Sequence, residues 1–133
     1  MGLVKKVDHV AIIAKDLEES INFYTKILGF ELIAREVIDH QKIKNAILRA
    51  AGDSFVVELV QFTDDREYYY GDGMFEVLAL KVDDIFETVK MLKAQGIEFL
   101  LDEPVQMAPD DFFTFFRGPA GEKLEIIQNK RDF

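Results

Sequence analysis

The apolar and polar residues of this chain form one pattern that occurs twice. In each copy an apolar, β-branched stretch is followed by an aspartate, by apolar residues at helical spacing and then by a glycine. Three further stretches of strand character complete the copy. The expected strands are Val4–Ala14, Phe30–Val37, Ile43–Ala50, Phe55–Phe62, Met74–Val82, Ile97–Leu101, Phe112–Arg117 and Lys123–Gln128, and the expected helices are 17–27 and Ile85–Gln95.

The two expected helices have matching start and stop signals. Asp16 and Asp84 are expected N-caps, because an aspartate carboxylate accepts hydrogen bonds from the free N–H groups of the first helical turn. Gly29 and Gly96 are expected to end the helices, since glycine readily adopts the left-handed conformation found there. The core-facing spacing in the first helix falls on Leu17, Ile21, Tyr24 and Ile27 or Leu28.

One register, with an offset of about 68 positions, relates the two copies. It pairs His9 with Val77, Asp16 with Asp84, Gly29 with Gly96 and Glu58 with Glu125. Repetition on this scale indicates two packed copies of one supersecondary unit. We therefore expect an α+β fold of two tandem βαβββ modules in a single domain, with module 1 at residues 1–62, a polar connector at 63–73 and module 2 at 74–133.

The composition narrows the range of partners. The 133 residues are 49% hydrophobic and 31% charged, which is typical of a soluble globular domain. A formal net charge of −9 argues against nucleic acid and anionic membranes as partners, because both favour a basic surface. The chain has no cysteine, no apolar run long enough for a bilayer and no signal-peptide pattern, so a cytoplasmic location is expected.

Three polar residues interrupt strands that are otherwise apolar. Glu58 lies in FVVELVQF and Glu125 in KLEIIQ, while His9 precedes the apolar run VAII. An isolated buried charge is too costly to keep, so each carboxylate must reach water in a cavity or a cation. Each residue alone would be interpreted as a partly exposed strand residue. Two glutamates at repeat-equivalent positions, with a histidine at the start of the repeat, favour a functional cluster.

The segments VDHVAIIAKDLEESINFYTKILGFEL, VVELVQ and GPAGEKLEIIQ together resemble the vicinal oxygen chelate superfamily. Its members include glyoxalase I, methylmalonyl-CoA epimerase, extradiol dioxygenases and the fosfomycin and bleomycin resistance proteins. The resemblance covers essentially the whole chain. It implies that the modules form a curved, open, mixed β-sheet cup, with a metal bound inside by residues of the first and last strands of each module. It also implies a small-molecule substrate or ligand and a homodimer.

Carried over by position, the resemblance implies that His9, Glu58 and Glu125 are metal ligands. The fourth ligand position, usually a histidine, is occupied by Val77, which cannot bind a metal. Glu76 is adjacent, but strand alternation points it to the other face unless the strand is bulged there. One imidazole and two carboxylates would suit zinc, nickel or manganese, more weakly than a four-ligand site.

The resemblance leaves two functions open. Extradiol dioxygenases resemble the two-histidine, one-carboxylate triad, and the loss of the second ligand histidine at Val77 leaves too few ligands for it, so we set this branch aside. Glyoxalase- and epimerase-type members are lyases or isomerases that polarise a substrate oxygen with a metal and move a proton at the neighbouring carbon. In that case the resemblance implies that Glu125 and Glu58 are the catalytic carboxylates and that Glu125 moves the proton. Bleomycin-resistance-type members bind a small molecule or antibiotic without a metal. Val77 favours this second function and the two glutamates favour the first, which is our leading interpretation.

Other residues fit a binding cup without specifying its contents. In DFFTFF, strand alternation puts Phe113 and Phe115 on one face and Phe112 and Phe116 on the other, so one pair is expected to pack on a helix. The tyrosines of 68–70 suit either a lid or an interface. Arg117 and His40 are expected at the surface, and the stretch Asp102–Asp111, which holds two of the three prolines, is expected to be a loop.

Overall fold

The computed structural model describes residues 9–52, 55–67 and 77–130, and the chain divides into two compact units between residues 68 and 69. This division lies inside the range 63–73 proposed above for the connector. Each unit is described by itself. That both belong to a single domain stays a prediction.

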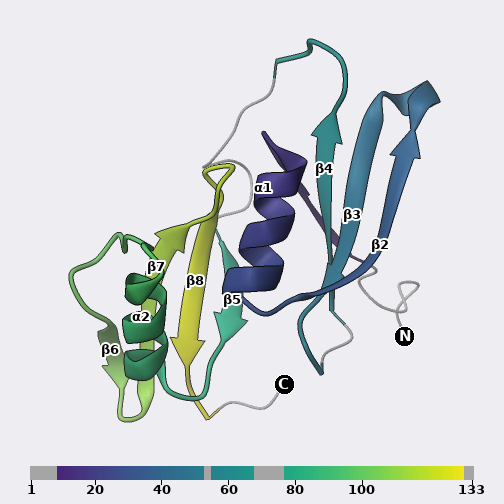
Figure 1. Ribbon diagram of the computed structural model, residues 1–133. Helices are drawn as coiled ribbons and strands as arrows, with labels where there is room; N and C mark the ends of the chain where they lie inside the picture. The colour runs from purple at the N-terminus through teal and green to yellow at the C-terminus, as the bar shows by residue number, and fades with distance from the viewer. Residues whose placement is uncertain (1–8, 53–54, 68–76, 131–133) are drawn as a thin grey trace, which may run out of the picture. The chain divides into compact units, whose positions relative to one another are not determined.

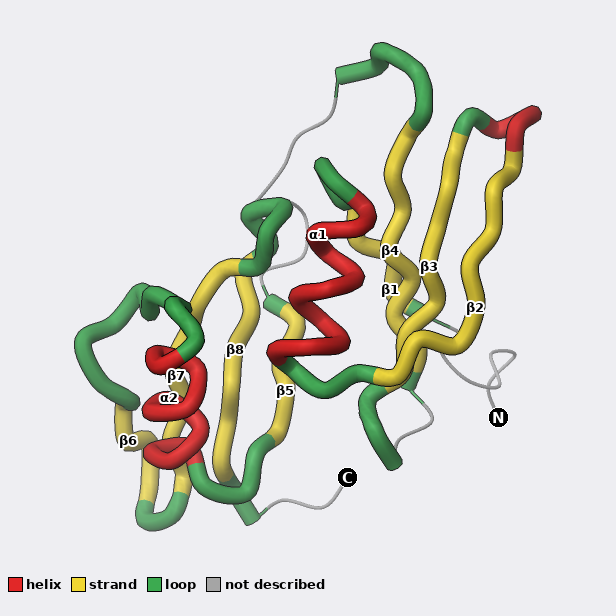
Figure 2. Tube along the Cα trace, in the orientation of Figure 1, coloured by secondary structure: helices red, strands yellow, loops and turns green. Residues whose placement is uncertain are grey.

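The first unit contains a four-stranded mixed sheet with one helical segment (Figures 1 and 2). The sheet order is β1-β4-β3-β2, with β1 parallel to β4 and the other pairs antiparallel. Its elements are β1 (Val10–Ile13), α1 (Leu17–Asn22), a π-helical segment η1 (Phe23–Ile27), β2 (Glu31–Ile38), a 3-10 turn η2 (Asp39–Gln41), β3 (Ile43–Arg49) and β4 (Val56–Phe62).

The second unit repeats this topology. Its sheet order is β5-β8-β7-β6, with β5 parallel to β8 and the other pairs antiparallel. Its elements are β5 (Leu78–Lys81), α2 (Ile85–Ala94), β6 (Val105–Ala108), β7 (Asp111–Arg117) and β8 (Lys123–Gln128). Two βαβββ units in an α+β fold are therefore confirmed.

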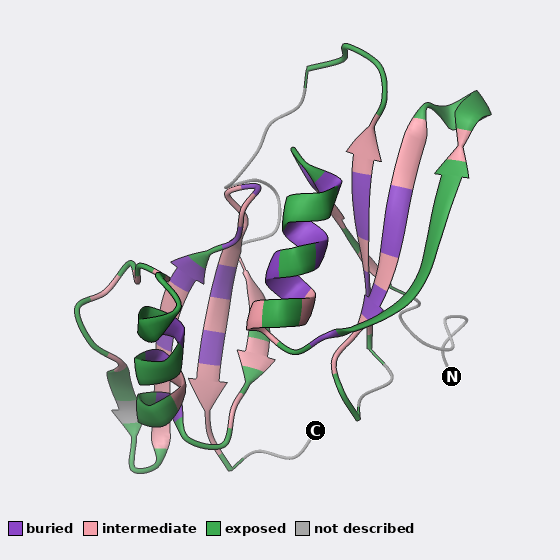
Figure 3. Cartoon of the chain, viewed as in Figure 1, coloured by how far each residue is buried: buried purple, intermediate pink, exposed green. Residues whose placement is uncertain are grey.

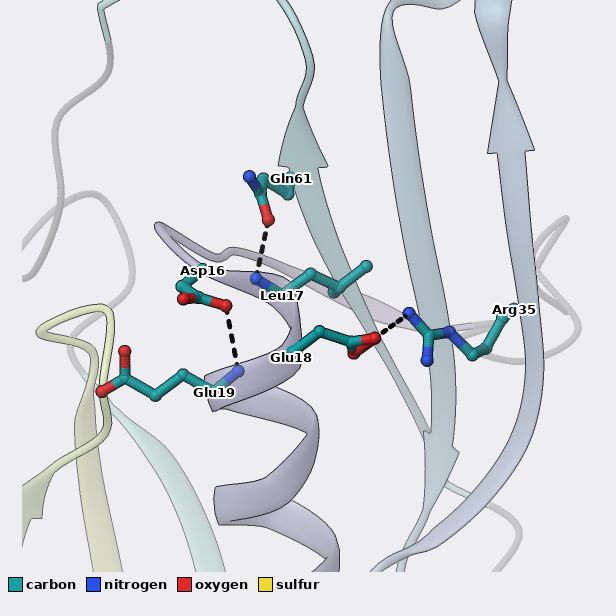
Figure 4. Close-up of polar contacts among 6 residues, drawn as sticks. All are labelled: Asp16, Leu17, Glu18, Glu19, Arg35 and Gln61. Atoms are coloured by element: carbon teal, nitrogen blue, oxygen red, sulfur yellow. Dashed lines mark hydrogen bonds and ion pairs between the residues drawn. The ribbon is translucent and has the colours of Figure 1, made fainter.

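The first helix begins as the sequence predicts, and a second side chain also holds its start (Figure 4). Asp16 accepts a hydrogen bond from the backbone N–H of Glu19 at 3.1 Å. The amide oxygen of Gln61, near the end of β4, accepts from the backbone N–H of Leu17 at 2.7 Å. Free N–H groups at the helix start are thus satisfied by a cap and by the last strand of the same unit.

The second helix has the same arrangement. Asp84 accepts from the backbone N–H groups of Phe86 and Glu87, at 3.1 Å each. Gln128, at the end of β8, accepts from the N–H of Ile85 at 2.9 Å. The glutamine three positions after the repeated glutamate therefore has one structural role in both units, a role that the sequence reading missed.

The core of each unit lies between the helix and one face of the sheet (Figure 3). In the first unit α1 lies against β3 and β4. The buried residues there are Leu17, Ile21, Tyr24, Ala46, Leu48, Val57 and Leu59. In the second unit α2 lies against β8, and the buried residues include Ile85, Val89, Leu92, Phe116, Leu124 and Ile126. The predicted core positions Leu17, Ile21 and Tyr24 are confirmed.

Both helices end at the predicted glycines, but the first is not α-helical over its whole length. Gly29 and Gly96 do follow the helices with φ of 80° and 88°, as the stop signals require. The prediction of one continuous α-helix over 17–27 is wrong, because the segment after Asn22 is π-helical and Leu28 donates its N–H to the carbonyl of Phe23 at 3.2 Å. The wider turn coincides with the burial of two adjacent aromatic residues, Phe23 and Tyr24.

The strand predictions fail between residues 97 and 108. The range Ile97–Leu101 forms no strand; Phe99 makes one isolated bridge to Phe116, and the two rings lie 5.4 Å apart. Ile97, Phe99 and Leu101 are half-buried and Leu100 is exposed, so alternating burial in this range occurs without a strand. The sixth strand is Val105–Ala108, inside the range expected to be a loop. Pro104 and Pro109 flank this edge strand and lie outside it, so neither removes a ladder hydrogen bond.

The first strand of each unit is shorter than predicted within the described residues. The prediction Val4–Ala14 corresponds to Val10–Ile13, and Met74–Val82 corresponds to Leu78–Lys81. Residues 4–8 and 74–76 lie outside the described residues. The remaining strands agree with their predictions to within one residue at each end.

Candidate functional site

His9 and Glu58 lie side by side in the first unit. His9 directly precedes β1, and Glu58 in β4 is paired in register with Ala11 of β1. The His9 Nε2 to Glu58 Oε1 distance is 3.4 Å. The side chains are 40% and 18% exposed respectively, so the glutamate is mostly buried while the histidine remains open to solvent. The prediction that these two residues approach each other is therefore consistent with the structure.

Asn45 joins this pair and was not predicted. It lies in β3, is only 2% exposed, and its Nδ2 donates a 2.7 Å hydrogen bond to Glu58 Oε2. The same Nδ2 donates to Glu36 Oε1 of β2 at 3.3 Å. Within the described part of the chain Asn45 Oδ1 is buried and has no hydrogen-bond partner. The sequence feature that could have indicated Asn45 is that it is the one polar residue in the stretch from Asn45 to Leu48.

These side chains form a polar row across β2, β3 and β4 of the first sheet, and His9 extends it to the start of β1. Glu36 pairs in register with Asn45, and the two contacts of Glu58 extend the row to Asn45 on one side and His9 on the other. We define the polar row as His9, Glu58, Asn45 and Glu36. It follows the strand order β1-β4-β3-β2 and lies on the face opposite Val57 and Leu59 of β4, because strand neighbours alternate between faces.

Glu125 occupies the matching place in the second unit. It pairs in register with Ala79 of β5 and Phe115 of β7, as Glu58 pairs with Ala11 and Ile47. Val77 directly precedes β5, as His9 precedes β1. The register that the sequence predicted for these four positions is therefore present in the strand pairing.

The rest of that row is apolar in the second unit. Phe113 is the register equivalent of Asn45, and its partner Val105 in β6 is the equivalent of Glu36. The Phe113 and Phe115 rings lie 5.4 Å apart. Lys123 Nζ lies 4.4 Å from the centre of the Phe115 ring, a cation–π contact. The second row consists of Val77, Glu125, Phe113 and Val105, so Glu125 is its one charged member.

The predicted division of the phenylalanines is confirmed for these strands. Phe112 contacts Phe86 of α2, with ring centres 5.0 Å apart, and Phe116 is fully buried. Phe113 and Phe115 lie on the other face with Glu125. Arg117 is exposed and donates to the Gly121 carbonyl at 2.8 Å, and His40 is exposed in η2, as expected. Glu76 and the tyrosines of 68–70 lie outside the described residues.

The geometry of His9 and Glu58 fits two neighbouring positions of a metal site. Nitrogen and oxygen ligands about 2.1 Å from a tetrahedral metal lie roughly 3.4 Å apart, the separation of Nε2 and Oε1 here. Across residues 9–52, 55–67 and 77–130, no three histidine, aspartate or glutamate side chains gather to hold a metal ion. Glu125 belongs to the second unit, and the set His9, Glu58 and Glu125 stays a prediction.

Comparison with known proteins decides the family. A family model described as Glyoxalase/Bleomycin resistance protein/Dioxygenase superfamily matches residues 6–126. The chain belongs to this superfamily. The resemblance to the vicinal oxygen chelate group is thereby confirmed, and the two mixed sheets agree with a glyoxalase-like fold. Among the described residues no helix has the length and apolarity needed to cross a membrane.

Named relatives of this superfamily member are distant. A lactoylglutathione lyase of Neisseria meningitidis is 28% identical over 92% of this chain and 89% of its own length. A probable chloroplastic lactoylglutathione lyase of Arabidopsis thaliana is 29% identical over 93% of this chain, which spans only 36% of that protein. The crystal structure of TnmS3, an antibiotic binding protein from Streptomyces, matches 98% of this chain and 100% of its own with a TM-score of 0.77. At 21% identity, that likeness shows the fold alone.

Proposed function

We propose that this chain is a glyoxalase-type lyase or isomerase that acts on a small oxygenated metabolite or its thiol conjugate. In this proposal His9, Glu58 and Glu125 hold a divalent metal, namely zinc, nickel or manganese. The observation that carries it is the approach of His9 Nε2 and Glu58 Oε1 to 3.4 Å, with Asn45 holding the other oxygen of the same carboxylate. Relatives named lactoylglutathione lyase support the reaction class.

The proposed chemistry divides the work between the two glutamates. A bound divalent metal supplies polarisation of a substrate oxygen, which acidifies the neighbouring C–H bond. Glu125 would take the proton from that hydroxyl-bearing carbon and return it to the adjacent carbonyl carbon, while the hydroxyl proton of the first carbon passes to the oxygen of the second. One C–H and one O–H bond break, one of each forms, and no further reactant is needed. Glu58 is fixed by Asn45 and remains a ligand throughout. His9 supplies the neutral imidazole nitrogen.

A second candidate is a metal-free protein that binds a small molecule or an antibiotic. The observation that favours it is the apolar row of the second unit, where Val77, Phe113 and Val105 replace the three polar residues of the first. Such a wall suits an apolar or aromatic ligand. TnmS3 is described as an antibiotic binding protein, which shows that the fold hosts this kind of function.

Metal analysis of protein purified without a histidine tag separates the two candidates. The enzyme proposal expects near-stoichiometric zinc, nickel or manganese in the wild-type protein. It also expects that metal to be lost on Glu58→Gln and reduced on Glu125→Gln. Absence of metal after soaking with all three ions would contradict it and leave the binding protein.

Two further parts of the proposal concern the assembly and the cell. We propose a homodimer in the cytoplasm that binds a small molecule, on the resemblance and the acidic composition given above. Size-exclusion chromatography with light scattering tests the dimer. A monomer at micromolar concentration would contradict that part and leave the metal proposal standing.

A further inference from the structure

The side-chain amide of Asn45 donates hydrogen bonds to two carboxylates. Its Nδ2 donates to Glu58 Oε2 at 2.7 Å and to Glu36 Oε1 at 3.3 Å. Ionised carboxylates only accept hydrogen bonds, so the nitrogen must face them and the oxygen must face away. The shorter bond is charge-assisted and therefore strong. It occupies Oε2 of Glu58 and leaves Oε1, the atom 3.4 Å from His9 Nε2, for another partner.

The fold itself does not require an amide at this position. In the second unit the register equivalent of Asn45 is Phe113, and the same βαβββ topology forms around it. Asn45 Oδ1 is buried with no hydrogen-bond partner among the described residues, which is destabilising. An apolar residue would avoid that cost, so the benefit of Asn45 must lie in the contact made by its nitrogen.

We propose that Asn45 is a positioning residue that holds the Glu58 carboxylate with Oε1 beside His9. This arrangement presents an imidazole nitrogen and a carboxylate oxygen to a divalent cation before the cation arrives. Hydrogen bonds from outside the ligand set orient ligands in this way and strengthen metal binding. The inference rests on the metal-dependent function proposed above, and it assigns Asn45 no contact with the substrate.

Cobalt(II) is a suitable probe, because its visible absorption reports ligand geometry as well as occupancy. We compare the wild-type chain with Asn45→Leu, which removes the amide but keeps the number and branching of its heavy atoms, and Asn45→Thr, which retains an O–H donor. Thr114→Val is the matched control: Thr114 is also buried with an unpartnered polar atom, and its strand β7 has the sheet position of β3. Glu58→Gln removes a ligand charge.

The expected result is a loss of cobalt affinity of roughly 10–100-fold in Asn45→Leu, the range for lost outer hydrogen bonds. We also expect an altered cobalt spectrum at saturation, which a general loss of stability would not produce. Asn45→Thr should lie between Asn45→Leu and wild type, and Thr114→Val should match wild type.

Other outcomes separate the two proposals. Loss of binding in Glu58→Gln with wild-type affinity and spectrum in both Asn45 variants overturns the positioning role and leaves the metal site intact. No cobalt binding by the wild-type chain, with no difference from Glu58→Gln, overturns the metal-dependent function and this inference together. If Asn45→Leu does not fold, Asn45→Val takes its place, because valine has the shape of threonine without its donor. Wild-type affinity and spectrum in Asn45→Val then count against positioning.

Discussion

The two units share one topology and one set of helix-capping contacts. They differ in the residues around the glutamate on the other face of the sheet. In both, an aspartate caps the helix, a glutamine from the last strand binds the first helical N–H, and a glutamate three positions earlier lies on the opposite face. The first unit adds His9, Asn45 and Glu36 to that glutamate, whereas the second adds Val77, Phe113 and Val105. The helix-capping residues are therefore repeated in both units, whereas the residues around the glutamate differ.

The two glutamates therefore have different neighbours. Glu58 is between a histidine and an amide that donates to it. Glu125 pairs with a phenylalanine that carries a cation–π contact from Lys123. The donor on Glu58 suits a metal ligand, and the proposal gives the proton-transfer role to Glu125.

The largest expected effect comes from removing one glutamate at a time. Glu58→Gln should lower zinc affinity by more than roughly 100-fold, because it removes the charge of a ligand and leaves one oxygen to serve both Asn45 and the metal, and loss of an outer hydrogen bond alone costs up to that much. Glu125→Gln should lower the zinc affinity less than Glu58→Gln does, and it should lower the turnover rate more. Competition titration with a zinc-binding dye measures both. Equal losses of affinity in the two variants would remove the distinction between the units.

The next effect comes from making the second unit resemble the first. Val77→His should raise metal affinity at least about tenfold, or about 1.4 kcal/mol, because it supplies the fourth ligand of a closed site. Val77→Ala is the control for the loss of valine alone. An unchanged affinity in Val77→His would show that the repeat register or the cup geometry is wrong.

A smaller effect is expected where the units are alike. Asp16→Ala and Asp84→Ala should each lower the free energy of unfolding by about 1 kcal/mol, the usual cost of a lost N-cap. The two costs should be similar, since both carboxylates accept from the helix start at 3.1 Å. Urea unfolding measures them. A loss of unfolding free energy in only one of the two variants would mean that the caps do not stabilise both units in the same way.

The smallest effect concerns a buried hydroxyl of the second unit. Thr114 Oγ1 has no hydrogen-bond partner in the described part of the chain. Thr114→Val should therefore leave the free energy of unfolding unchanged or raise it by up to about 1 kcal/mol. A clear destabilisation in urea would reveal a partner for this hydroxyl, such as a buried water molecule.

The sequence predicts what depends on local pattern and on repetition. Asp16 and Asp84 are identifiable as caps by residue type, and the facing of Phe112 and Phe113 follows from strand alternation alone. The pairing of Glu58 with Ala11 and of Glu125 with Ala79 follows the repeat register.

What the sequence did not predict depends on contacts between distant strands. Asn45 lies 13 positions from Glu58 and Gln61 lies 44 positions from Leu17, so nothing local links them. The strand Val105–Ala108 is defined by its pairing with β7, and the helical spacing of residues 17–27 does not reveal the π-helical turn that accompanies the burial of Phe23 and Tyr24. Tertiary packing outweighed propensity in both places.

X-ray absorption spectroscopy of the zinc-loaded wild-type chain tests the central claim most directly, because it counts the imidazole ligands of the metal. The proposal predicts one imidazole, from His9, with the remaining ligands oxygen, and two imidazoles after Val77→His. Absence of any imidazole ligand, or an imidazole signal that persists in His9→Ala, would contradict the assignment of the metal site to the polar row of the first unit.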